Sequence, residues 1–131
     1  MIVLDTHAWI WFVSNPKLLS KKAKTAVHSA VEEKGILISS ISVWEVALLT
    51  AKKRLKLSLD LADWVAKSEN LPFVNFITVS NAIAIKAVNL PGSLHPDPAD
   101  RIVIATALSA GAPLVTKDKK ILDYPHVKTI W

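Results

Sequence analysis

The chain has 131 residues, of which 51% are apolar and 21% are charged, with no cysteine and a formal net charge of +5. This composition excludes a disordered chain, a disulfide framework, a thiolate metal site and a cysteine nucleophile. The length predicts a single domain over residues 1–131. We expect a cytoplasmic protein without a membrane anchor, because the chain shows neither a signal-peptide pattern nor an apolar run long enough to span a bilayer.

The first half of the chain alternates short apolar runs with helical patterns. In chain order we expect a strand over 2–4, a helix over 6–13, a helix over 20–33, a strand over 36–39 and a helix over 42–54. The Asn15-Pro16 pair ends the first helix, and Gly35 ends the second. The expected helices therefore lie in the segments that connect one expected strand to the next.

The second half continues the same alternation. We expect a helix over 60–69, an extended segment over 73–79, a helix over 81–89, a proline-containing loop over 91–98, a helix over 99–110, and strands over 114–116 and 127–130. Gly111 closes the helix before it. This order predicts an α/β fold, a three-layer α/β/α domain with a mainly parallel central sheet.

Five acidic residues are predicted to meet at one edge of this sheet. Asp5 follows the first strand and Asp118 follows the fourth, Glu45 lies in the first turn of helix 42–54, and Asp97 and Asp100 stand at the start of helix 99–110. The carboxyl ends of parallel strands and the N-termini of the connecting helices share one edge, where α/β proteins bind ligands.

Each acid also has a purely structural interpretation. Ser42 and Glu45 have the spacing of a capping box, Asp97 precedes a proline as an N-cap does, and Asp5 and Asp118 could each cap the next helix. Capping does not explain why acids gather at one edge, since Ser, Thr or Asn would cap as well. Clustered carboxylates repel one another, and a divalent cation relieves that repulsion. Oxygen ligands favour Mg²⁺ or Mn²⁺, which can activate water against a phosphodiester.

Four segments containing these acids together resemble the PIN-domain nucleases, in particular the VapC toxins of VapBC toxin–antitoxin pairs. The segments are IVLDTH at 2–7, ISSISVWE at 38–45, HPDPADRI at 95–102 and LVTKD at 114–118. The resemblance covers essentially the whole chain. It implies a PIN fold, a Mg²⁺- or Mn²⁺-dependent endoribonuclease acting on RNA, a homodimer, and a VapB-type antitoxin that occupies the groove.

The resemblance also implies roles for individual residues. Metal-site roles fall by position on four acids: Asp5, Glu45, Asp100 and Asp118. Thr6 and Thr116 are implied as hydroxyls that orient the site, and Asp97 as a further acid near it. The spacing leaves open whether Asp97 or Asp100 is the direct ligand, and we favour Asp100 because Pro98 places Asp97 outside the helix.

Several basic and aromatic residues have two interpretations. Arg101 could hold a substrate phosphate or pair with a site acid, or could form an ion pair on the helix surface. His95 could contact RNA, although a hydrogen bond within its loop is the commoner role. Three lysines flank Asp118 and are candidates for phosphate contact: Lys117, Lys119 and Lys120. Trp9 and Trp11 lie two residues apart on one helix, so only one of them can face the interior, and the other could line an interface.

Two other functions fit an α/β domain of this size. A phosphoacceptor receiver domain carries acids, a threonine and a lysine at the same edge, but it needs an early pair of adjacent acids, and here Thr6 follows Asp5. A catalytically silent RNA-binding module is the second alternative. A phosphatase of the haloacid-dehalogenase type would need an acid two residues after Asp5, where His7 stands.

Overall fold

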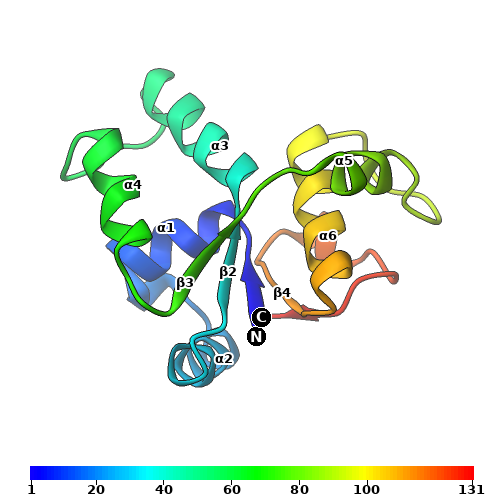
Figure 1. The fold of residues 1–131 in the computed structure, drawn as a ribbon, viewed down its shortest axis with the longest axis horizontal. Coiled ribbons are helices and arrows are strands. Elements are labelled where there is room, and N and C mark those ends of the chain that lie inside the picture. The colour runs from blue at the N-terminus through cyan, green and yellow to red at the C-terminus, as the bar shows by residue number, and fades with distance from the viewer.

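The computed structural model describes residues 1–131 and arranges them as helices on both faces of a five-stranded parallel sheet (Figure 1). The strands are β1 (Ile2–Leu4), β2 (Ile36–Ser39), β3 (Val74–Ile77), β4 (Leu114–Val115) and β5 (Thr129–Ile130). Their order is β3-β2-β1-β4-β5, and every neighbouring pair is parallel. The three-layer α/β/α fold with a parallel sheet is therefore confirmed.

The strand order creates a switch point between β1 and β4. From β1 the chain proceeds outward through β2 to β3, and it then returns to the other side of β1 to form β4 and β5. In such sheets the crevice for ligands opens at the carboxyl ends of the strands where the order reverses. A receiver fold follows a different strand order, 2-1-3-4-5, so the sheet excludes the receiver interpretation.

The helices are α1 (Thr6–Ser14), α2 (Lys21–Glu32), α3 (Ser40–Ala51), α4 (Leu61–Glu69), α5 (Asn81–Val88), α6 (Pro98–Ala110) and the short α7 (Lys119–Leu122). Alternate side chains of the strands enter two cores. Leu4 and Ile38 pack with α1, α2 and α4 on one face, whereas Val3 and Leu37 pack with α6 on the other. The helices, the longest of which is α6 with 13 residues, all fall short of what a membrane span requires.

Two buried tryptophans fix the layer formed by α1 and α4. The Trp9 and Trp64 ring centroids lie 4.7 Å apart, and both side chains are almost fully buried. Their indole N–H groups donate to hydroxyls of the opposite helix, Trp9 to Ser68 at 3.0 Å and Trp64 to Ser14 at 3.2 Å. Trp9 is thus the inward-facing member of its pair, and Trp11 lies half-buried at the edge of the sheet.

The structure corrects the expected start of α3. This helix begins at Ser40, directly after β2, and Ser39 is its N-cap, with its hydroxyl accepting from the Ile41 N–H at 3.2 Å. The capping-box interpretation of Ser42 and Glu45 is therefore wrong, because both residues lie inside the helix. Two short helical turns were not expected from the sequence: the 3₁₀ turn Pro16–Leu18 and α7.

Candidate active site

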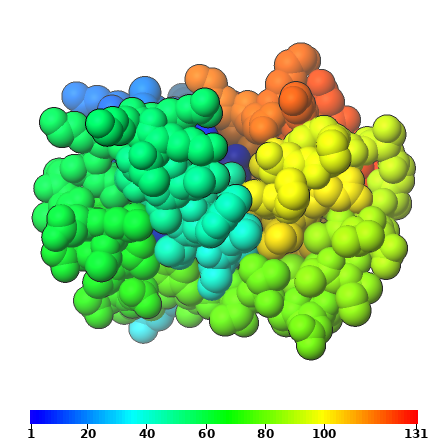
Figure 2. All heavy atoms as spheres, turned by 90° about the horizontal axis from the view of Figure 1, so that it is seen from above, coloured from blue at the N-terminus to red at the C-terminus, as the bar shows by residue number.

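A pocket of about 470 Å³ opens at the switch point, between the N-terminal ends of α3 and α6. In the space-filling view it is the hollow between the α3 side chains in cyan and the α6 side chains in yellow (Figure 2). All five acids expected at this edge line it: Asp5, Glu45, Asp97, Asp100 and Asp118. Residues separated by more than one hundred positions in the chain therefore meet in one acidic pocket.

Asp5 lies at the base of the pocket and is fixed by both neighbouring elements. Its backbone N–H donates to the Val115 carbonyl at 3.1 Å, and its carboxylate accepts from the Ala8 N–H at 2.8 Å as the N-cap of α1. Burial raises the pKa of Asp5 from its ordinary value of 3.8 to about 6, although hydrogen bonds from Thr116 and Ala8 oppose the rise. The fold therefore holds a carboxyl group where ionisation is costly.

Glu45 reaches the pocket from the second turn of α3 and is held by Thr6. The Thr6 hydroxyl donates to Glu45 Oε1 and lies 2.9 Å from the buried Ser42 hydroxyl. Burial, followed by the charges of neighbouring acids, raises the pKa of Glu45 to about 7, while the hydrogen bond from Thr6 opposes this. Thr6 thus connects the first turn of α1 to the acid supplied by α3.

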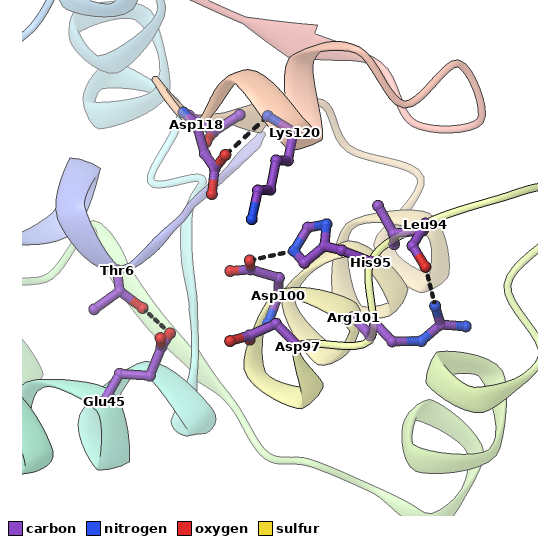
Figure 3. A network of polar contacts seen from close by, with 10 residues as sticks. Thr6, Glu45, Leu94, His95, Asp97, Asp100, Arg101, Asp118 and Lys120 are labelled. Atoms are coloured by element: carbon purple, nitrogen blue, oxygen red, sulfur yellow. Dashed lines mark hydrogen bonds and ion pairs between the residues drawn. The ribbon is translucent and has the colours of Figure 1, made fainter.

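Asp97 and Asp100 enter from the start of α6 and differ in role. Asp97 is exposed and caps the helix, accepting from the Asp100 N–H at 2.9 Å. Asp100 is half-buried, and its Oδ2 lies 2.7 Å from His95 Nε2 (Figure 3). Burial raises the pKa of Asp100, and the hydrogen bond from His95 opposes that rise. Asp97 therefore serves the helix terminus, and Asp100 is the more sheltered carboxylate.

Asp118 and Thr116 complete the pocket on the β4 side. Thr116 is fully buried, and its hydroxyl accepts from the Asp118 N–H at 3.0 Å. The Asp118 carboxylate in turn accepts from the Lys120 N–H at 2.9 Å and caps α7. Thr116 does not itself line the pocket, but it fixes the backbone that supports Asp118, and its hydroxyl lowers the pKa of Asp5.

The structure does not bring Arg101 into the pocket. Its guanidinium points away from the acids and donates to three backbone carbonyls at the end of α5 and in the following loop (Figure 3). Neither interpretation made from the sequence, a phosphate or acid contact or an ion pair on the helix surface, describes this arrangement. Successive residues of a helix point about 100° apart, so an inward Asp100 directs its neighbour elsewhere.

Four further residues line the pocket without having been predicted as metal or positioning residues: His7, Trp11, Val103 and Lys117. Lys117 Nζ lies 5.9 Å from the Trp11 ring centroid, within the range of a cation–π contact. Lys120 also extends toward Asp100 (Figure 3), whereas Lys119 pairs with Asp123 at 3.4 Å. The sequence indicated these lysines as phosphate contacts through their positions beside Asp118.

The donor set fits a hard divalent cation. Every acid in the pocket offers oxygen, and no lysine or arginine forms an ion pair with any of the five. No three ligating side chains converge closely enough to enclose an ion as they stand. Mg²⁺ keeps several of its waters and uses only one or two carboxylates, so a partly open arrangement of acids suits such an ion.

Comparison with known proteins gives a consistent result. The family model of the PIN domain matches residues 2–127. The chain is 33% identical to Ribonuclease VapC22 of Mycobacterium tuberculosis, covering 99% of this chain and 98% of that protein.

Solved structures share the fold at lower sequence identity. A toxin–antitoxin complex from Klebsiella pneumoniae matches with a TM-score of 0.63 and 24% identity over 97% of this chain and 95% of that one. VapBC2 from Rickettsia felis, bound to a DNA fragment from its promoter, matches with a TM-score of 0.69 and 18% identity over 98% and 97% of the two chains.

Proposed function

The chain belongs to the PIN-domain family, and from that premise we propose that it is a divalent-metal-dependent endoribonuclease. The observation that carries this proposal is the pocket in which five acids from separate segments meet, with a raised pKa for three of them. A relative named as a ribonuclease supports RNA as the substrate. The VapC name of that relative, together with the VapBC2 structure, supports a role as the toxin of a toxin–antitoxin pair with a VapB-type partner.

We propose that Asp5, Glu45, Asp100 and Asp118 together would hold one or two ions of Mg²⁺ or Mn²⁺. When bound, such a cation supplies positive charge that polarises the scissile phosphate and favours ionisation of an attacking water. Thr6 holds the Glu45 carboxylate, and Thr116 holds the Asp118 backbone. Lys117 and Lys120 place two cations near the opening, where they offset the charge of an incoming phosphodiester. The homodimer and the cytoplasmic location stay predictions.

An RNA-cleavage assay with and without chelator tests the proposal. We expect purified protein to cleave mixed RNA in Mg²⁺ or Mn²⁺ and to leave it intact in EDTA. Asp5→Asn should abolish cleavage, because it removes a negative charge from the pocket while Asn still caps α1. Asp63→Asn, an exposed acid on α4, is the matched control and should cleave like the wild type.

Two outcomes of this assay would contradict the proposal. Equal survival of RNA in Mg²⁺ and in EDTA, with folded protein, would favour a catalytically silent RNA-binding module. Full activity in folded Asp5→Asn would contradict the assignment of Asp5 to the metal.

A further inference from the structure

We propose that His95 is a positioning residue that orients Asp100, and that Arg101 holds the loop from which His95 acts. This inference rests on the proposed function and adds two residues to its machinery. It concerns the loop between α5 and α6, residues 89–97, which contains no helix or strand.

The first observation is the contact between His95 and Asp100. His95 Nε2 and Asp100 Oδ2 lie 2.7 Å apart, and the two side chains are only 18% and 25% exposed. The other His–acid pair of the chain, His28 with Glu32, is 3.4 Å long and its side chains are 80% and 71% exposed. Exposed pairs of that kind do little to fix the orientation of their side chains. A short contact that is sheltered from solvent restricts rotation of the carboxylate.

The second observation is that the contact uses one carboxylate oxygen and leaves the other. A carboxylate that binds a metal is ionised and only accepts hydrogen bonds, so in that state Nε2–H of His95 is the donor to Oδ2. Asp100 Oδ1 has no protein hydrogen-bond partner. With Oδ2 fixed by His95, Oδ1 is turned to the side of Asp100 that faces Thr6 and Asp118 (Figure 3). His95 thereby selects the oxygen that Asp100 offers to the pocket.

The third observation explains how an irregular loop can place His95. Arg101 Nη1 donates to the Leu94 carbonyl at 3.3 Å, while Nε and Nη2 donate to the Ala87 and Val88 carbonyls at 2.8 and 3.2 Å. The Arg101 side chain therefore ties the residue before His95 to the end of α5. The Tyr124 hydroxyl donates to the Pro91 carbonyl and fastens the same loop further upstream.

These contacts form a chain from the end of α5 to the pocket. Arg101 fixes Leu94, Leu94 carries His95, and His95 fixes Asp100, which stands directly before Arg101 in α6. A partner that orients a metal ligand in this way typically contributes 10- to 100-fold to metal affinity. The arrangement gives Arg101 a purpose although its side chain points away from the acids.

Mn²⁺ affinity, measured by calorimetric titration of the full chain, tests the inference independently of catalysis. We expect His95→Ala to weaken Mn²⁺ binding about 10- to 100-fold without a comparable change in the melting temperature of the metal-free protein. His95→Asn should behave in the same way, because its side chain is too short to reach Asp100. His95→Gln, whose amide N–H can donate from a similar distance, should recover a large part of the affinity. His28→Ala is the matched control and should bind Mn²⁺ like the wild type.

The outcomes separate this inference from the proposed function. Wild-type Mn²⁺ affinity in His95→Ala and His95→Asn would overturn the positioning role, while metal-dependent RNA cleavage by the wild type would still support the nuclease. A weakened His95→Gln that does no better than His95→Ala would also count against it, because any disturbance of the loop would then suffice. Absence of both Mn²⁺ binding and RNA cleavage in the wild type would overturn both proposals.

Discussion

Asp5 serves the fold and the pocket with the same carboxylate. As the N-cap of α1 it accepts from the Ala8 N–H, an interaction that favours the ionised form. Burial at the base of the pocket opposes ionisation more strongly and raises the pKa of Asp5 to about 6. A cap alone would not need a buried acid, because Asn caps without a charge. The metal-free protein therefore loses stability at this residue in order to keep a carboxylate in the pocket.

This conflict predicts the pH dependence of stability without divalent cations. The folded-state pKa values of Asp5 and Glu45, about 6 and about 7, exceed their ordinary values of 3.8 and 4.5. The folded state then binds more protons than the unfolded state, so the free energy of unfolding falls as the pH rises from 4 through 7. We expect Asp5→Asn, which cannot ionise, to be about 1–3 kcal/mol more stable than the wild type at pH 8.

Urea unfolding in EDTA at pH 5 and pH 8 measures this difference. Asp63→Asn controls for the general removal of a negative charge and should follow the wild-type pH dependence, because Asp63 is exposed. An Asp5→Asn variant that is no more stable than the wild type at pH 8 would show that Asp5 ionises in the folded protein without cost.

The sequence predicted which residues lie close together better than it predicted where their side chains point. The five acids could be assigned to one pocket because strand ends and helix starts share an edge in any parallel sheet. The position of Pro98 already favoured Asp100 over Asp97 as the acid that points into the site. That His95 bonds Asp100 depends on the path of the loop 89–97, which the local pattern does not specify. One interpretation brought Arg101 to the substrate because it adjoins Asp100, although helical geometry turns neighbouring side chains apart.

The residue at which helix α3 begins determines the position of Glu45. The helix begins immediately after β2, so Ser42 becomes buried beside Thr6 and Glu45 lies in the second turn. The sequence predicted a helix here but not its first residue, because Ser39, Ser40 and Ser42 are all good N-caps. The short turns Pro16–Leu18 and α7 were missed since three or four residues are too few to show a helical period.

The link between α1 and α3 predicts the effect of Thr6→Val. Valine keeps the shape of the buried side chain but removes the hydroxyl that donates to Glu45. Glu45 would then be free to change rotamer, and we expect RNA cleavage to fall about 10- to 100-fold. Initial rates of RNA cleavage at saturating Mg²⁺ measure this loss.

A second buried threonine provides the control. Thr106 in α6 donates to the Ile102 carbonyl and lies outside the pocket. Thr106→Val should therefore leave the cleavage rate unchanged, even if it alters the melting temperature slightly. Equal losses of activity in both variants would mean that the defect follows from repacking of the core rather than from the contact with Glu45.

The pocket is acidic although the chain as a whole carries a net positive charge. The formal net charge is +5, yet five acids gather where α3 and α6 approach the switch point of the sheet. The sequence predicted the alternation of strands and helices, but the order β3-β2-β1-β4-β5 depends on which strand pairs with β1, and that is decided by packing over long distances. The repulsion within the pocket is therefore a property of the assembled fold.

That repulsion predicts that a divalent cation stabilises the whole protein. Nearby acids contribute to the raised pKa of Glu45 and of Asp100, and an ion bound among them would remove this cost only in the folded state. A ligand at 100 times its Kd adds about 2.7 kcal/mol to the free energy of unfolding. For a chain of this size we expect saturating Mn²⁺ to raise the melting temperature by about 5–10 °C.

Thermal unfolding at pH 7.5 in Mn²⁺, compared with NaCl of equal ionic strength, measures the stabilisation. The NaCl series removes the general effect of screening, and Asp5→Asn should show a much smaller Mn²⁺ shift than Asp63→Asn because only Asp5 lines the pocket. A wild-type melting temperature that Mn²⁺ leaves unchanged would mean that the five carboxylates gather without binding an ion. The carboxylates would then relieve their repulsion by protonation alone. The proposed hydrolysis would have no bound cation to activate the water.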